Sequence, residues 1–183
     1  MSEATPTVPE PTEHSSDEAI DPCVAAGLPG APHEKLQAFE GTWDAAVQFW
    51  MQPGADPVPS QGTMVNEWIL GGRFLEQRYE SDFMGSPFHG RGLFGYSQLD
   101  QRYEGFWVDT MSTGMLIESG SYDESTRTFT MLGQVTNPAD GQVMRKKTII
   151  TVESETRHTM AMHFSEGEPE EFWKCMEIVY TKR

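Results

Sequence analysis

Histidine and cysteine side chains are the first candidates for chemistry in this sequence of 183 residues. The histidines are His14, His33, His89, His158 and His163, and the cysteines are Cys23 and Cys175. No pair of histidines has the i, i+4 spacing of a helical metal site. His158 and His163 are an odd number of residues apart, so an unbroken strand would place them on opposite faces. We therefore expect no metal site.

His158 is the one histidine that the pattern connects with a cofactor. The same face of its expected strand also carries Met160, Met162 and Phe164. A single imidazole in an apolar barrel can hold haem iron, which makes His158 an alternative haem ligand. A half-exposed histidine near a strand end is the simpler interpretation, because intermediate burial is ordinary for this residue type. We expect no cofactor, with haem as the alternative.

Asp109 is the best candidate for proton transfer. It follows Trp107 by two residues, so both side chains share a face of a strand. A buried Asp109, with Tyr79 or Tyr103 in reach, would suit an enzyme that works at a barrel mouth. A carboxylate at a strand end that binds turn amides is the favoured interpretation, because carboxylates are seldom buried without a partner.

Other catalytic signatures are missing from the sequence. There is no Gly-x-Ser-x-Gly elbow, and the glycine-rich segment 90–95 is not followed by the helix that a phosphate loop requires. Its glycines are expected to let a strand bend at a barrel corner. The sequence therefore leaves an enzyme as an alternative and not as the leading hypothesis.

A short basic run, Arg145-Lys146-Lys147, lies within an expected strand. Alternation along the strand sends Lys146 to the face opposite that of its two neighbours. One of these cations could enter a barrel lumen and bind a ligand carboxylate. A solvated strand with one partly buried stem is the favoured interpretation.

These residues must be positioned by strands, because short strand patterns follow one another from Thr42 onward. The predicted strands are 42–51, 61–70, 73–82, 88–98, 102–110, 114–122, 126–136, 142–152, 156–165 and 170–181. Tight turns make consecutive strands antiparallel, and closing into a barrel removes the exposed edges. A short helix between Pro32 and Gly41, with Leu36 and Phe39 on one face, is expected against a barrel end. The predicted fold is an all-β, up-and-down barrel of about ten strands.

The Gly71-Gly72 turn gives a test of register. A two-residue glycine loop favours a hairpin in which Trp68 pairs with Leu75 and Met64 pairs with Tyr79. One face of this hairpin then carries no charge away from the turn, and we place that face inside.

The same alternation in other strands yields a large apolar interior. The residues predicted to bind a ligand are Phe49, Met64, Trp68, Tyr79, Phe94, Tyr96, Trp107, Met131, Met160 and Met162. Ten strands enclose more space than eight, and thioether side chains adapt to irregular apolar shapes. The alternative is that the same side chains pack a dry core.

Charge and composition limit which partners the protein can bind and indicate its domain organisation. The formal net charge of -15 argues against binding nucleic acid or anionic membranes. Residues 1–32 contain no Lys or Arg and few large apolar residues, so we expect a disordered acidic tail before a barrel domain at 33–183. We see no signal peptide, and two cysteines fit a reducing cytoplasm. A monomer or homodimer is expected.

Several segments resemble a known bacterial family. They are Leu70 to Leu75, Met84 to Tyr96, the set Tyr103, Trp107, Asp109, Met111, Thr113, Gly114 and Met115, and then Gly120 to Asp123, Thr128 to Thr130 and Met176 to Thr181. Together they resemble the family catalogued as domain of unknown function fifteen-seventy-nine, over roughly residues 33–183. The family usually has Asp where this chain has Ser97, which is expected to change a turn interaction.

The resemblance implies a lipocalin-like, or calycin-like, barrel but no established activity. Gly41-Thr42-Trp43 is similar to the lipocalin Gly-x-Trp signature, in which the tryptophan closes a barrel end under a basic residue. Lys182 or Arg183 would cover Trp43 here.

The leading hypothesis is therefore a protein that binds a small apolar or amphipathic ligand inside its barrel. The alternatives are a haem-binding barrel, an enzyme with a carboxylate at the barrel mouth, and an interaction module whose acidic tail binds a basic partner.

Overall fold

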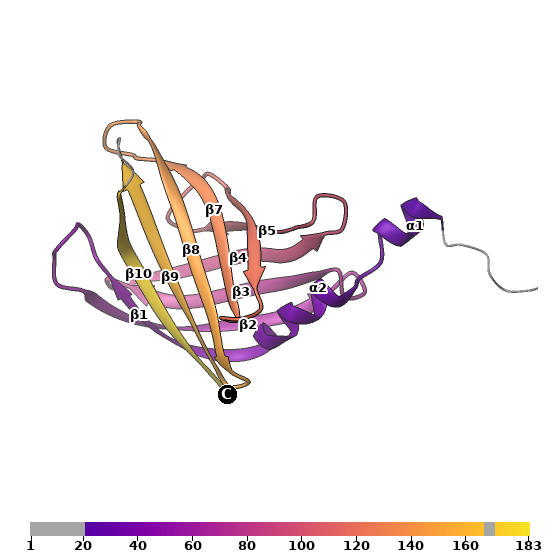
Figure 1. Ribbon diagram of the computed structural model, residues 1–183. Helices are drawn as coiled ribbons and strands as arrows, with labels where there is room; N and C mark the ends of the chain where they lie inside the picture. Colours follow the sequence, from indigo (N-terminus) through magenta and orange to yellow (C-terminus); the bar gives the residue numbers. More distant parts are fainter. Residues whose placement is uncertain (1–20, 167–170) are drawn as a thin grey trace, which may run out of the picture.

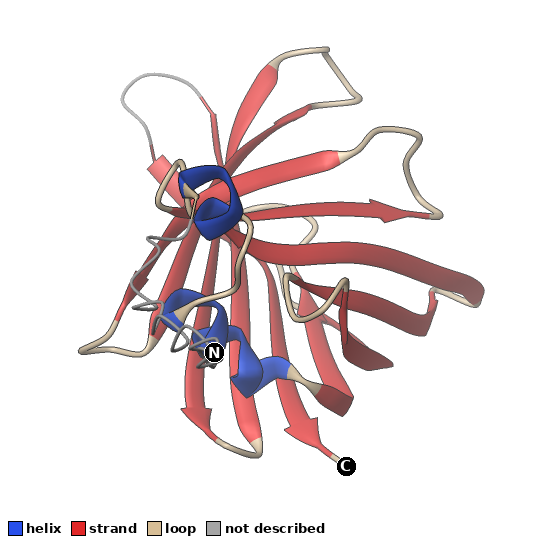
Figure 2. Ribbon diagram, turned by 90° about the vertical axis from the view of Figure 1, so that its right-hand side faces the viewer, coloured by secondary structure: helices blue, strands red, loops and turns tan. Residues whose placement is uncertain are grey.

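A computed structural model describes residues 21–166 and 171–183, and it shows ten strands wrapped into one barrel (Figures 1 and 2). The strands are β1 (Gly41–Phe49), β2 (Val58–Ile69), β3 (Phe74–Phe83), β4 (Ser86–Ser97), β5 (Arg102–Asp109), β6 (Leu116–Asp123), β7 (Thr128–Thr136), β8 (Val143–Ser154), β9 (Arg157–Glu166) and β10 (Glu171–Lys182). The helices are α1 (Pro22–Ala26), α2 (Ala31–Glu34) and the 3-10 helix η1 (Lys35–Phe39). Residues 1–20 of the expected tail lie outside the described residues.

Every strand is antiparallel to its neighbours in sequence, and β1 pairs with β10 to close the barrel. The prediction of an all-β, ten-stranded, up-and-down barrel is confirmed. Closure gives each described strand two partners, so the sheet has no free edge.

The expected register of the first hairpin is also confirmed. In the β2–β3 pair, Trp68 faces Leu75 and Met64 faces Tyr79. On the outer face Glu67 lies opposite Glu76, and Arg78 forms an ion pair with each of these two carboxylates. One guanidinium therefore relieves the repulsion between them.

The short N-terminal helix closes one end of the barrel, as expected. Leu36 and Phe39 are buried there against Phe94 and Phe129 from the barrel wall. The strand that follows, β1, carries Trp43 as its third residue, and this side chain is 0% exposed. The expected cation–π contact over this indole is confirmed for Lys182, whose Nζ lies 5.3 Å from the ring centroid.

The opposite end of the barrel carries the loops β1–β2, β3–β4, β5–β6 and β7–β8, since β1 runs away from the helices. In Figure 1 the β1–β2 loop lies on the left and α2 on the right. Of the helices that the structure describes, none is long and apolar enough to cross a membrane.

Candidate functional site

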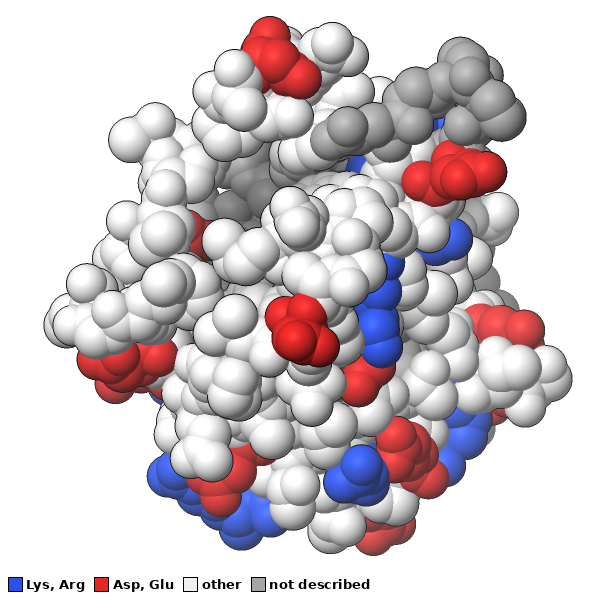
Figure 3. All heavy atoms as spheres, turned by 90° about the vertical axis from the view of Figure 1, so that its left-hand side faces the viewer, with Lys and Arg blue, Asp and Glu red and all other residues white. Residues whose placement is uncertain are grey.

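The barrel encloses a cavity of about 1070 Å³. All ten strands contribute side chains to its wall, and residues of the β1–β2 and β5–β6 loops line its opening. Figure 3 looks at the left-hand side of Figure 1 and shows a hollow in a face that is mostly uncharged. Cavities of roughly 300–1,000 Å³ commonly hold small molecules, and this one lies just above that range.

Eight of the ten predicted ligand-binding residues line this cavity, namely Phe49, Met64, Tyr79, Phe94, Trp107, Met131, Met160 and Met162. Trp68 and Tyr96 do not line it. Trp68 Nε1 donates a hydrogen bond to Gln37 Oε1 at 2.8 Å, and the Tyr96 ring packs 5.9 Å from the ring of His33. Both residues lie at the level of the helix, which fills the closed end of the barrel.

The carbonyl oxygen of Phe39 ties the helix to the barrel floor. Trp43 Nε1 and Asn66 Nδ2 both donate hydrogen bonds to it, each at 2.8 Å. All three groups are buried, so the two bonds satisfy a carbonyl at the end of η1 that would otherwise lack a partner. This floor keeps the helix in place as the lower boundary of the cavity.

His158 lies at the same floor inside a cluster of aromatic rings. Its imidazole stacks on Tyr180 at 4.5 Å, and Trp43 and Phe39 approach it with ring centroids at 4.4 and 5.0 Å. His158 also lines the cavity, so the alternative of a haem held by this imidazole stays a prediction, which a visible absorption spectrum tests.

Burial lowers the pKa of His158 to about 3. Its Nδ1 has no hydrogen-bond partner among the described residues, so no described hydrogen bond at this atom stabilises a charged ring. The imidazole is neutral in the folded protein, whereas it titrates near its ordinary value when the chain unfolds.

This difference predicts a loss of stability in acid. Because the folded-state pKa lies below the unfolded-state value, His158 favours unfolding increasingly as the pH falls from about 6.5 towards 3. We expect this residue to reduce the free energy of unfolding by about 2 kcal/mol between pH 7 and pH 5. Urea denaturation at both pH values measures it.

His158→Phe is the matched variant, because it keeps an aromatic ring in the stack and removes the titration. Its free energy of unfolding should fall less between the two pH values than that of the natural protein. Other histidines titrate equally in both proteins, so equal falls would contradict the assignment.

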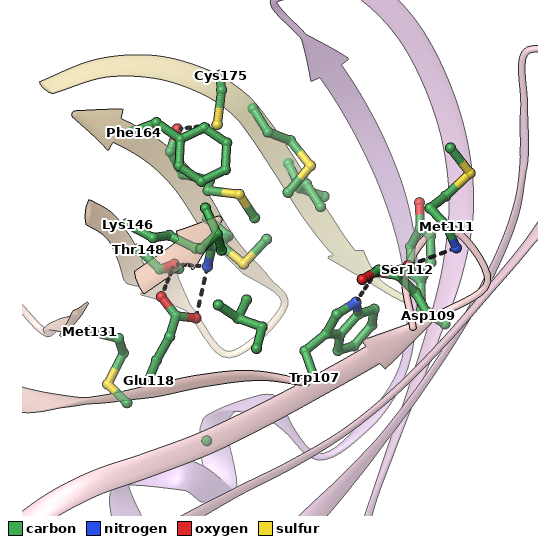
Figure 4. A pocket seen from close by; sticks show the side chains of 18 of the residues that line it. Trp107, Asp109, Met111, Ser112, Glu118, Met131, Lys146, Thr148, Phe164 and Cys175 are labelled. Carbon is green, nitrogen blue, oxygen red and sulfur yellow. Dashed lines mark hydrogen bonds and ion pairs between the residues drawn. The ribbon is translucent and has the colours of Figure 1, made fainter. Parts of the chain in front are cut away.

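A buried polar triad interrupts the apolar wall, as Figure 4 shows. Lys146 Nζ lies 2.8 Å from Glu118 Oε2 and donates a hydrogen bond to Thr148 Oγ1 at 2.6 Å. Thr148 in turn donates to Glu118 Oε1 at 2.7 Å. The Lys146 side chain is 3% exposed. The favoured interpretation of a solvated strand is therefore wrong for Lys146, which enters the lumen and has a carboxylate of the protein itself as its described charge partner.

Gly133 makes the triad possible. Glu118 lies on β6 and Lys146 on β8, and β7 runs between them with Gly133 paired to both residues. A Cβ atom on Gly133 would lie 2.9 Å from the Glu118 Cγ atom and 2.7 Å from the carbonyl oxygen of Ile117. The missing side chain on β7 leaves the path along which Glu118 reaches across to Lys146.

Burial dominates the electrostatics of this wall. It lowers the pKa of the Lys146 ammonium, and the Glu118 carboxylate works against that shift. It also raises the pKa of the Cys175 thiol to about 11, although nearby Lys146 opposes the change. Cys175 is thus a neutral thiol in the cavity wall at physiological pH and a poor nucleophile.

Asp109, at the cavity mouth, has structural partners for both carboxylate oxygens. Its Oδ2 accepts a hydrogen bond from Trp107 Nε1, and its Oδ1 accepts one from the backbone of Met111, each at 2.9 Å. The Trp107 indole in turn lies over Gly90 and Gly92 of β4. A Cβ on Gly90 would lie 2.1 Å from Trp107 Cζ2, so these glycines make room for the indole.

Of the residues of the enzyme alternative, Tyr103 lies apart from Asp109, whereas Tyr79 lines the same cavity as Asp109. Tyr103 donates its hydroxyl to the carbonyl oxygen of Pro32 at 2.9 Å, at the closed end, whereas Asp109 lies at the mouth. Burial raises the pKa of Tyr103 to about 12, which makes it a weak acid. Within the described chain, no three His, Cys, Asp or Glu side chains gather as a metal site.

Sequence reasoning missed Glu118 and Thr148. Glu118 shares its strand face with Tyr122, and Thr148 shares its face with Lys146 and Ile150, so alternation held a signal. A charged residue on an otherwise apolar face was the feature to look for.

Fold and cavity together define a closed, ten-stranded antiparallel barrel with a polar triad in an apolar lumen. The sequence matches the family described as "Protein of unknown function (DUF1579)" over residues 28–182, and the chain belongs to this family. Comparison with curated proteins found no match. Among solved structures the chain is similar to a redesigned β-barrel, with 15% identity, a TM-score of 0.42, and coverage of 81% of this chain and 95% of that chain.

Proposed function

We propose that this protein binds a small apolar or amphipathic ligand inside its barrel. The cavity of about 1070 Å³ carries this proposal, because its wall is mainly apolar and open at one end. Four methionines of the wall, Met64, Met131, Met160 and Met162, give it a surface that adapts to irregular shapes. An apolar ligand would gain free energy by leaving water for this lumen.

The rim of the opening supports the same proposal. Met51, Met111 and Met115 line the mouth of the cavity and are largely exposed. Exposed apolar groups around the opening of a cavity are typical of a ligand-binding groove.

The cysteines support a cellular compartment for this activity. Cys23 and Cys175 are both free thiols, which supports the reducing cytoplasm that the sequence suggests. The alternative of an interaction module depends on the acidic tail, most of which lies outside the described residues.

The direct test is native mass spectrometry of the protein purified from its own host, together with a visible absorption spectrum. A retained mass of lipid-like size is expected. Titration with a neutral apolar dye such as Nile red covers ligands that are lost during purification. If neither a retained mass nor saturable dye binding is found, the ligand-binding proposal is wrong.

Gly105→Leu should block the cavity without disturbing the fold. Gly105 lies on the cavity side of β5, and the nearest atoms to an added Cβ are Leu93 O at 3.4 Å and Phe94 Cδ2 at 3.8 Å. The leucine side chain therefore projects into open space. We expect dye affinity to fall at least about tenfold, while stability is kept or rises because glycine weakens a strand interior.

Gly105→Ala is the matched control for this change. It removes the same backbone freedom but adds only one methyl group, so it should keep most of the dye affinity. Equal dye binding by the leucine variant and the natural protein would place the ligand outside this cavity.

A further inference from the structure

The buried triad has one hydrogen-bond donor left over. An ammonium group carries three N–H donors, and Lys146 has two oxygen partners among the described residues, one on Glu118 and one on Thr148. The Thr148 hydroxyl donates its one proton to Glu118, so it offers no further donor. Lys146 lines the cavity, so its third donor is the one that a ligand can reach. A ligand with an acceptor oxygen would complete the ammonium's hydrogen bonds.

The charge balance of the cavity decides what kind of acceptor fits. Of the described residues that line it, the charged ones are Asp109, Glu118 and Lys146, which are two acids and one base. The positive charge of Lys146 is already matched by Glu118 at 2.8 Å. A carboxylate ligand at the free donor would bring a second negative charge next to Glu118, where the low dielectric makes repulsion strong. The net charge of -15 adds a further repulsion to any anion that approaches.

We propose that the ligand class is a neutral hydrogen-bond acceptor on an apolar chain, such as an ester, ketone or amide, and that Lys146 Nζ donates to its carbonyl oxygen. This inference rests on the proposed function, because it concerns the same cavity. It also differs from the fatty-acid role that a lone lumenal cation would suggest. Here Glu118 neutralises the cation and excludes a free carboxylate.

The surroundings of the triad fit the rest of such a molecule. Thr148 pairs across the sheet with Met131 on one side and Met162 on the other, and Lys146 pairs with Phe164. Figure 4 shows Met131 and Phe164 near the polar groups. The acceptor would thus meet the only buried cation among the described lining residues, while its chain lies against thioether and aromatic groups.

The experiment is displacement of Nile red by three ligands of matched length: methyl decanoate, undecane and decanoate, at neutral pH. In the natural protein, the ester should bind about tenfold more tightly than the alkane, because it gains a hydrogen bond to a charged donor. Decanoate should bind at least about tenfold more weakly than the ester.

Glu118→Gln is the sharpest variant, because it leaves the ammonium without its counter-charge. Its preference should invert, with decanoate at least about tenfold tighter than in the natural protein. The double variant Glu118→Gln/Lys146→Met removes both charges and serves as the control. It should bind the dye but lose the preference for ester over alkane.

The outcomes separate this inference from the proposed function. If decanoate binds the natural protein as tightly as the ester, or if the double variant keeps the ester preference, the inference is overturned while dye binding still supports a ligand cavity. If no dye or ligand binds the natural protein, both are overturned.

Discussion

Lys146→Met alone should destabilise the protein by about 3–5 kcal/mol, because it leaves the Glu118 carboxylate in the barrel wall without its cation. Methionine fills nearly the same volume as the lysine stem, so the loss reports the unpaired charge and not a cavity. Urea denaturation followed by far-ultraviolet circular dichroism measures the difference.

The double variant Glu118→Gln/Lys146→Met tests whether the stability lost in Lys146→Met comes from the unpaired charge of Glu118. Replacing both charges by neutral groups removes the cost of burying them, so most of the stability should return. A double variant as unstable as the single one would mean that Lys146 stabilises the barrel by packing alone.

Trp43→Ala is expected to cost about 3–5 kcal/mol, which is typical of removing a fully buried large aromatic side chain. The indole is 0% exposed, donates a hydrogen bond to the Phe39 carbonyl oxygen and packs 4.4 Å from the ring of His158. Its removal loosens the contact between η1 and the barrel floor. The free energy of unfolding measures the loss, and near-ultraviolet circular dichroism should report weaker aromatic packing.

Two controls bracket this prediction. Trp43→Phe keeps an aromatic ring and loses the hydrogen bond, but Asn66 still donates to the same carbonyl oxygen. Its cost should be well under half that of the alanine variant. Trp50, at the other end of the barrel, is only half-buried, so Trp50→Ala should cost about 1 kcal/mol. Equal costs for the two alanine variants would show that Trp43 does not hold the closed end.

Several features of this protein could be predicted from the sequence because they depend on local rules. Turn residues at regular intervals fix antiparallel neighbours, and ten such strands in one domain close into a barrel. The Gly71-Gly72 turn determines the register of β2 and β3, which in turn decides that Met64 and Tyr79 point inward. The same alternation places Met160 and Met162 in the lumen.

Strand β10 shows where local rules fail. Alternation cannot explain why Cys175 and Met176, which are adjacent in sequence, both line the cavity. The pairing of β10 with β9 shifts between Lys174 and Met176, and this bulge turns both side chains inward. A bulge depends on how two strands fit the barrel, so one strand's sequence does not reveal it.

The helix decided which inward side chains reach the lumen. Trp68 and Tyr96 have the correct strand face for the cavity, but α2 and η1 fill the barrel at their level. Strand periodicity gives the face of a residue and says nothing about its height relative to a segment packed from elsewhere.

The polar triad is the clearest contribution of tertiary structure. Each of Glu118, Lys146 and Thr148 alone looks like a solvated residue on an amphipathic strand, because a charge is buried only when it has a partner. Those partners are separated by about thirty positions along the chain, and β7 with Gly133 brings them together. The sequence by itself determined a closed apolar barrel, and only the folded sheet determined which polar groups meet inside it.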